Sequence, residues 1–133
     1  MRLIRQALQT PDGTIIESRH RHDYIEYTDK VANDIYVIDG GLEYERQSVN
    51  KIPAKSLSVY LEDGIEAVRE ALTWGTRGRS GREPVRLIKL CEMSNAHIEA
   101  CLETQPRMHP HYREAMQMEL QYRSENGLTI TDD

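Results

Sequence analysis

Apolar and polar residues alternate along the first sixty positions, which is the period of a β-strand with one buried face. The clearest case is residues 33–46, where apolar residues alternate on both sides of Gly40-Gly41. This pattern predicts a hairpin, because two glycines suit the two positive φ values of a type I′ turn. Residues 14–29 are long enough for two strands or one bent strand. Further strands are predicted in residues 3–8 and 56–61.

The apolar spacing becomes helical after residue 61. Residues 62–74 place Ile65, Val68 and Leu72 on one helical face, and Asp63 precedes them as a suitable N-cap. This spacing predicts a first helix over 62–74.

Two more helices are predicted beyond a glycine-rich break. Residues 75–81 end the first helix, and residues 84–90 form a short strand or an extended link. The later helices are expected to run from Ser94 as N-cap to about Glu103, and from Pro110 in the first turn to about Ser124. Gly127 stops the last helix, and the tail 127–133 is expected to be loose. The pattern predicts one α+β domain, with a sheet-forming part in 1–61 and a helical part in 62–126.

Composition favours a small protein completed by a partner subunit. The chain has 133 residues, 38% of them hydrophobic, with seven tyrosines, one tryptophan and no phenylalanine. Such a thin core is often completed by a second copy, so a homo-oligomer is expected. The two cysteines make no disulfide framework, no signal-peptide pattern is seen, and no apolar run approaches the roughly 20 residues of a membrane helix. A cytosolic protein without a membrane partner is therefore expected.

Charge is distributed unevenly along the chain. The net charge is -5, yet residues 74–90 hold five basic side chains against one acid, Glu83, a local charge of +4. A basic island in an acidic body suits one compact anion better than a long polyanion, which the remaining surface would repel. No nucleic-acid partner is therefore expected.

The stretch "SRHRHDY", residues 18–24, is a candidate for chemistry. On a strand, Ser18, His20 and His22 would share one face. The run is similar to part of the H-x-H-x-D-H signature of binuclear metallohydrolases, but Asp23 directly follows the second histidine and the terminal histidine is absent. Two such histidines can still bind zinc with help from other elements, for which three more are available, namely His97, His109 and His111. A hydrogen-bonded sheet face is the favoured interpretation, and no metal is predicted.

No catalytic set stands out. The chain has no G-x-S-x-G elbow and no distinct pair of carboxylates. Cys91 and Cys101 lie in apolar surroundings, which is typical of core cysteines and not of nucleophiles. The sequence therefore predicts neither an enzyme nor a cofactor.

Anion binding has better support. In "WGTRGRSG", residues 74–81, glycines alternate with Arg77 and Arg79, so backbone N–H groups and guanidinium forks can converge on a phosphate. The spacing is not that of a Walker loop, and an exposed flexible loop remains an equal alternative. Trp74 at the edge could stack on a base.

The last helix supplies further candidates. Arg123 follows Glu119 by four residues, the favourable order for a helical ion pair. Arg107 and Arg113 have no such local partner and are the better ligands. The face that carries Met116 and Leu120 indicates core or a subunit contact.

The landmarks "TPDGT", "SRHRHDY", "DGGLEY", "ALTWGTRG", "EMSNAHIEACLETQ" and "ELQYR" occur in this order between residues 10 and 123, and the resemblance that they carry covers roughly residues 5–123. In this order and spacing the chain resembles the first-described family of Thoeris anti-defence proteins, the phage sponges for cyclic ADP-ribose isomers. The resemblance implies an N-terminal antiparallel sheet followed by helices. It also implies a protein that binds glyco-cyclic ADP-ribose, made from NAD by a TIR-domain enzyme, in the cytoplasm of an infected bacterium and does not cleave it. Family members pair so that pockets form between protomers, and some form hexamers with separate sites for cyclic oligonucleotides.

The resemblance also implies a set of ligand-binding residues. The basic ones would neutralise the pyrophosphate, Trp74 or a tyrosine would stack on adenine, and Asn95 or His97 would bond sugar hydroxyls. His22 and Tyr24, from "HDY", would lie at the pocket rim. The basic candidates are Arg77, Arg79, Arg82, Arg107 and Arg113.

Two alternatives stay open at this point. One is a small phosphodiesterase that degrades a cyclic nucleotide with His20 and His22. The other is a phage interaction module whose basic loop contacts another protein.

Overall fold

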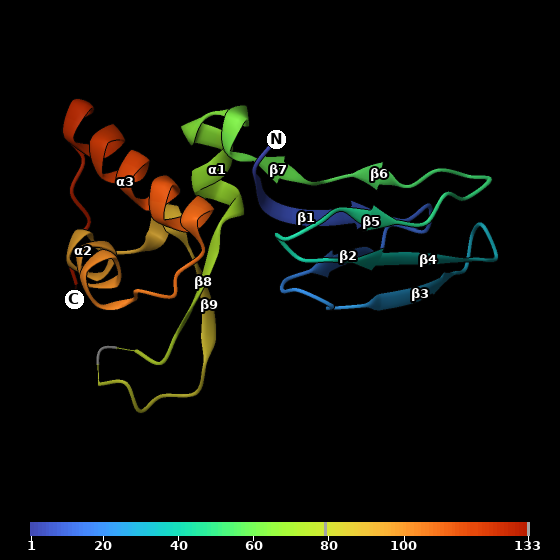
Figure 1. Cartoon of the computed structure of the whole chain (residues 1–133), viewed down its shortest axis with the longest axis horizontal. Helices are drawn as coiled ribbons and strands as arrows, with labels where there is room; N and C mark the ends of the chain where they lie inside the picture. Colours follow the sequence, from blue (N-terminus) through green and yellow to red (C-terminus); the bar gives the residue numbers. More distant parts are fainter. Residues whose placement is uncertain (79, 133) are drawn as a thin grey trace. The chain divides into compact units, whose positions relative to one another are not determined.

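A computed structural model describes residues 1–78 and 80–132 of the chain. The chain divides into two compact units, an N-terminal unit, Met1–Glu62, and a C-terminal unit, Asp63–Asp133. The boundary falls where the apolar period of the sequence changes from strand to helix. Antiparallel strands fill the first unit and the helices lie mostly in the second, so the predicted α+β class is confirmed (Figure 1).

The N-terminal unit contains two antiparallel sheets. In the first, β1 (Leu3–Gln9) lies between β2 (Ile15–Ser18) and β6 (Lys55–Ser56), and it also pairs with β7 (Val59–Tyr60). In the second, β4 (Asp34–Asp39) lies between β3 (Ile25–Asp29) and β5 (Arg46–Gln47). Their common core contains Leu8 and Ile16 from one sheet and Tyr36 and Ile38 from the other, so the two sheets are held together by apolar burial.

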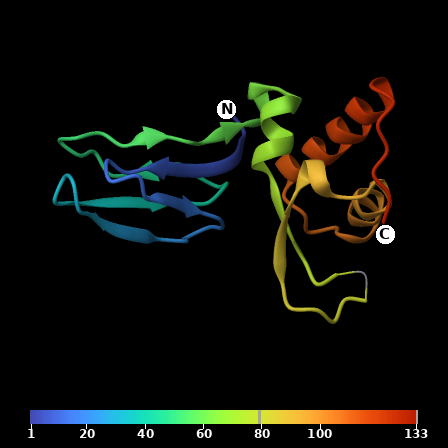
Figure 2. The ribbon, with the colours of Figure 1, turned by 180° about the vertical axis from the view of Figure 1, so that it is seen from behind.

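The C-terminal unit packs helices around a two-stranded sheet. A 3₁₀ turn, η1 (Leu61–Asp63), leads into α1 (Ile65–Ala71), which is followed by β8 (Thr73–Thr76) and β9 (Arg86–Lys89). A second 3₁₀ turn, η2 (Leu90–Glu92), precedes α2 (Asn95–Thr104) and α3 (Pro110–Glu125). Helix α3 contacts α1, α2 and η2, as the ribbon seen from behind also shows (Figure 2).

Each helix of this unit contributes fully buried side chains to the core or has them at its ends. They include Val68 and Leu72 beside α1, Met93 and Ile98 near α2, and Met116 of α3. Because Met116 is 0% exposed within a single chain, it belongs to the core and does not supply a subunit contact. Among the described residues no helix combines the length and the apolar composition that a membrane crossing requires.

Two helix starts that depend on local chemistry agree with the sequence, whereas the predicted Asp63 cap is wrong, because Gly64 is the N-cap of α1 and no side chain of the described residues caps this helix. The Ser94 hydroxyl accepts a hydrogen bond from the His97 backbone N–H at 3.0 Å and caps α2. Pro110 occupies the first turn of α3, and β9 forms where a short strand or an extended link was predicted.

Other predicted elements are wrong. The helix predicted over 62–74 ends at Ala71, because Thr73–Thr76 pairs with Arg86–Lys89 as a strand. The strand predicted over 56–61 is divided into β6 and β7. The stretch "SRHRHDY" is no sheet face: it leaves β2 at Ser18 and turns into β3, with His22 at φ 62°.

The hairpin predicted at Gly40-Gly41 has a longer loop than expected. Both glycines have positive φ, at 106° and 53°, but Asp39 pairs with Arg46 and six residues form the connection. A Cβ on Gly40 would lie 2.0 Å from the Tyr44 carbonyl oxygen, so the chain folds back tightly onto this glycine. The tyrosine therefore lies in the loop and not on a strand.

Candidate functional site

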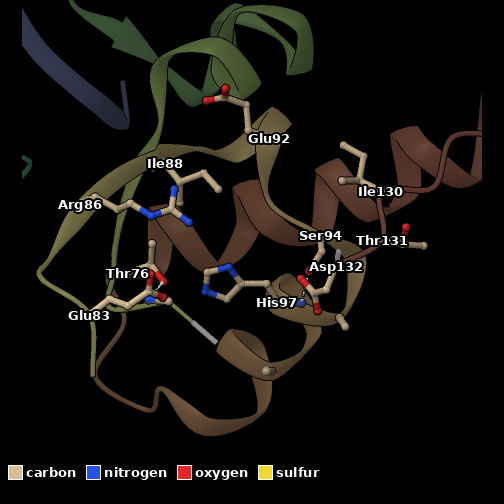
Figure 3. A pocket seen from close by; sticks show the side chains of 13 residues that line it. Thr76, Glu83, Arg86, Ile88, Glu92, Ser94, His97, Ile130, Thr131 and Asp132 are labelled. Atoms are coloured by element: carbon tan, nitrogen blue, oxygen red, sulfur yellow. Dashed lines mark hydrogen bonds between the residues drawn. The ribbon is translucent and has the colours of Figure 1, made fainter. Parts of the chain in front are cut away.

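The C-terminal unit contains a cavity of about 600 Å³. Three segments surround it: the β8–β9 hairpin with its loop, the start of α2 that follows soon after, and the distant residues 130–132 (Figure 3). The lining side chains carry hydroxyl, imidazole, guanidinium, carboxylate and aliphatic groups. They are Thr76, Gly78, Glu83, Arg86, Ile88, Glu92, Ser94, Ala96, His97, Ala100, Ile130, Thr131 and Asp132.

The register of the β8–β9 hairpin brings Arg86 to the cavity. Thr76 pairs with Arg86 and Trp74 with Ile88, and directly opposite residues of an antiparallel pair share a face. Of these four residues, Thr76, Arg86 and Ile88 line the cavity. The alternate residue Leu87 points to the other face and is 51% exposed.

The loop between the two strands places Glu83 against Gly78. Gly78 has φ 76°, and a Cβ built there would lie 1.4 Å from Glu83 Oε2. The Gly78 N–H donates to the Thr76 hydroxyl at 3.2 Å, and the Glu83 N–H donates to the Arg77 carbonyl at 3.0 Å. The glycine therefore lets the Glu83 carboxylate approach the backbone at the cavity wall.

The first turn of α2 forms a second wall. Ser94 caps the helix, and the His97 side chain points from this turn into the cavity, toward Arg86 and Thr76 (Figure 3). A helix N-terminus carries a partial positive charge and favours anions nearby. The wall thus combines a weak positive field with an imidazole that can donate or accept a hydrogen bond.

Residues 130–132 form the third wall, and hydrogen bonds of Leu128 and Ile130 hold this segment. The Asn95 N–H donates to the Ile130 carbonyl at 2.8 Å, and the Ile130 N–H donates to Asn95 Oδ1 at 3.0 Å. The Leu128 N–H donates to the Arg123 carbonyl at 2.8 Å. The expectation of a loose tail is therefore wrong for this segment.

A buried ionic network orients Asn95. Arg123, 0% exposed, donates to Asn95 Oδ1 at 2.8 Å, to Glu119 Oε2 at 2.7 Å and to the Leu90 carbonyl at 3.1 Å. Glu119 is also 0% exposed and accepts two bonds from Arg69, at 2.8 and 2.9 Å. The predicted Glu119–Arg123 pair is confirmed, but it is a buried element of the core and not a surface pair.

The structure brings some of the predicted ligand residues to this cavity. His97 lines it, and Asn95 holds its wall with an oxygen that already accepts two bonds. Trp74 lies on the same hairpin face but is not among the lining residues, and its ring meets that of Tyr112 edge-on at 6.3 Å.

The predicted arginines lie elsewhere or have other partners. Arg77, Arg82 and Arg107 are exposed and outside the cavity lining, and Arg79 lies outside the described residues. Arg113 donates to the Leu102 and Gln105 carbonyls, both at 2.8 Å, and so caps the end of α2. Ligand contacts by these arginines stay predictions.

His22 and Tyr24 belong to the N-terminal unit. His22 Nδ1 lies 3.1 Å from the Tyr44 hydroxyl, and that hydroxyl donates to Asp39 at 3.2 Å. The Tyr24 hydroxyl donates to Glu26 at 2.8 Å, and this bond raises its pKa. Their place at a pocket rim stays a prediction.

Sequence reasoning missed Glu83, Arg86 and Asp132 as lining residues. Arg86 was visible only as one member of the basic stretch, and the alternation of Arg86 with Ile88 along a short strand was the available signal. Glu83 and Asp132 gave no signal in the sequence. Glu83 reaches the cavity through its tight contact with Gly78, and Asp132 through the hydrogen bonds between Ile130 and Asn95.

Other candidate chemistry has little geometric support. Within residues 1–78 and 80–132, no three His, Cys, Asp or Glu side chains come together in a way that could hold a metal ion. Burial raises the pKa of both the Cys91 and the Cys101 thiols, which disfavours the nucleophilic thiolate. The cavity is therefore the candidate site, and its groups suit binding of a polar, partly anionic small molecule. Comparison of the chain with protein-family models, with curated proteins and with solved structures finds no match in any of the three.

Proposed function

We propose that this chain is a sponge that binds glyco-cyclic ADP-ribose and sequesters it without cleavage. In this proposal it acts in the cytoplasm of an infected bacterium, where it keeps a TIR-derived signal from its effector. The proposal extends the family resemblance and includes the homo-oligomer, dimer or hexamer, that the resemblance implies. The ligand that the protein sequesters is the cyclic nucleotide.

One observation carries the proposal: two of the landmark stretches line the same cavity. Thr76 and Gly78 come from "ALTWGTRG", while Ser94, His97 and their neighbours come from "EMSNAHIEACLETQ". Sixteen residues separate Gly78 from Asn95, so their meeting follows from the fold and not from proximity along the chain. Two of the sequence fragments on which the resemblance is based thus lie together at one cavity.

The size and chemistry of the cavity support the same conclusion. Small-molecule sites usually measure about 300–1,000 Å³, and this one measures about 600 Å³. The Arg86 guanidinium can form a fork with the pyrophosphate, and the first turn of α2 favours the same charge. Carboxylates and hydroxyls around it can accept hydrogen bonds from ribose.

The proposal predicts that bound signal is recovered intact. The protein is incubated with glyco-cyclic ADP-ribose, small molecules are removed by filtration, and the retained protein is denatured by heat. Mass spectrometry of the released fraction should show quantitative cyclic signal, because the proposed role is binding alone. A linear ADP-ribose product would instead indicate the phosphodiesterase alternative. Absence of any depletion from the filtrate would indicate an interaction module, and either result would contradict the proposal.

Arg86→Ala is expected to weaken binding of the cyclic signal about ten- to a hundredfold. A charge-assisted hydrogen bond contributes about 1.5–3 kcal/mol, and about 1.4 kcal/mol corresponds to a factor of ten. Calorimetric titration measures the change. The matched control is Lys89→Ala, on the same strand but the opposite face, where the ammonium lies 3.3 Å from Glu70. Equal affinity of Arg86→Ala and the parent protein would place the pyrophosphate elsewhere.

A further inference from the structure

We infer that the cavity selects ligands whose phosphate charge is confined to an internal pyrophosphate, with Glu83 and Asp132 acting against terminal phosphates. The inference rests on the proposed function and narrows it to a chemical class. That class is a pyrophosphate bridge that carries uncharged, hydroxyl-rich or amine-bearing groups at both ends.

The charges of the lining residues are the first argument. The described lining contains three carboxylates, on Glu83, Glu92 and Asp132, against one guanidinium, on Arg86. A site made only for phosphate would be expected to hold an excess of cations. This lining instead surrounds one strong cation with acceptors of hydrogen bonds.

The arrangement of these charges is the second argument. In Figure 3, Arg86 lies above Thr76 and Glu83 at one side of the group, His97 lies in the middle, and Asp132 lies beside Ser94 at the other side. An anion held between Arg86 and His97 would therefore have Glu83 on one side and Asp132 on the other. The pattern matches a molecule with its negative charge in the middle and hydrogen-bond donors at its ends.

The backbone near both end carboxylates is anchored by hydrogen bonds. Glu83 is packed against the Cα of Gly78, and its backbone is bonded to Arg77. Asp132 follows Ile130 by two residues, and Ile130 makes two hydrogen bonds with Asn95. Both side chains are exposed, so it is the anchored backbone and not burial that keeps each carboxylate in the lining.

Such carboxylates discriminate by charge. They can accept hydrogen bonds from ribose hydroxyls or an exocyclic amine, but a terminal phosphate placed there would meet a like charge at short range. Like-charge contacts are a general means of rejecting wrong ligands, and because both carboxylates are exposed they act most strongly at low ionic strength. ADP and ADP-ribose are a suitable pair of probes. Both contain adenosine and a pyrophosphate, but the pyrophosphate ends the molecule in ADP and carries a second ribose in ADP-ribose.

The test measures how well ADP and ADP-ribose displace glyco-cyclic ADP-ribose from the full chain, at fixed low ionic strength. The parent protein should favour ADP-ribose over ADP by about tenfold or more. Glu83→Gln and Asp132→Asn preserve side-chain size and remove the charge. At least one of these variants should bind ADP about five- to tenfold more tightly while its affinity for ADP-ribose does not increase. The matched control is Glu103→Gln, an exposed carboxylate of α2 outside the lining, and it should leave the ratio unchanged.

The outcomes separate this inference from the proposed function. If the parent protein does not bind the cyclic signal, the proposed function fails, and direct titration with ADP-ribose and ADP still decides the inference. If the signal binds but the ADP to ADP-ribose ratio is the same in the parent and both variants, the inference is overturned while the sponge remains. The inference is also overturned if neither probe binds to any of the three proteins.

Discussion

Replacing Glu119 by glutamine is expected to lower the free energy of unfolding of the C-terminal unit by about 3–5 kcal/mol, the usual cost of breaking a buried ion pair. Glu119 is 0% exposed and is the carboxylate shared by Arg69 and Arg123. Glutamine fills the same space but leaves two guanidinium groups without a counter-charge, one of them fully buried. Thermal and urea unfolding of the variant should both show the loss.

The matched control is Glu125→Gln, further along the same helix. Glu125 is exposed and accepts a single bond from Gln121 at 2.9 Å, so its replacement should change stability by less than about 0.5 kcal/mol. Equal effects of the two substitutions would show that the network around Glu119 is not what holds α1, α3 and the Asn95 side chain together.

Gly40→Ala is expected to destabilise the N-terminal unit by about 2–6 kcal/mol, through a strained backbone and a steric overlap. Gly40 has φ 106°, and an added Cβ would lie 2.0 Å from the Tyr44 carbonyl oxygen and 2.5 Å from its ring. The backbone oxygen cannot rotate away as a flexible side chain would, so the loop must shift.

Gly13→Ala isolates the two contributions. Gly13 has a similar φ of 93°, but nothing lies within 4 Å of an added Cβ. The substitution should therefore show the backbone strain alone, about 1–3 kcal/mol. Denaturant unfolding of both variants gives the difference, and a Gly40→Ala protein no less stable than Gly13→Ala would rule out the tight approach of Tyr44.

The sequence predicted those elements whose causes are local. The cap at Ser94, the proline at the start of α3 and the Glu119–Arg123 spacing each depend on residues within one helical turn, and each is present. The alternating period likewise indicated a sheet in the first half.

Predictions were wrong where distant residues decide the structure. Trp74 continues a helical period, but pairing with Ile88 draws it into a strand. Arg113 lacks a nearby acid, which suggested a ligand contact; that contact stays a prediction, but the guanidinium already donates to the carbonyls of Leu102 and Gln105. Every residue has a backbone carbonyl, so the hydrogen bonds of Arg113 to two carbonyls could not be inferred from composition or spacing.

The cavity was harder still to predict, because its three walls come from separate stretches. The glycine-rich loop and the start of α2 were recognised as candidate regions, but the wall formed by 130–132 depends on Asn95, which is oriented by Arg123 from 28 residues away. The Asn95 side chain, one of two expected to bond a sugar, has an oxygen that organises the protein around the site, and its sugar contact stays a prediction.

The attachment of residues 128–132 makes one wall of the cavity easier to release than the other two. Ile130 is only half-buried and Thr131 and Asp132 are exposed, so hydrogen bonds and not apolar packing hold this wall. Regions with few buried apolar contacts open locally at a lower free-energy cost than the core. The cavity can thus open by release of a few bonds at Asn95 and Arg123 while β8, β9 and α2 remain folded. Residence time of a captured molecule would then follow the lifetime of those bonds, and amide hydrogen exchange at Leu128 and Ile130 would slow when the cavity is filled.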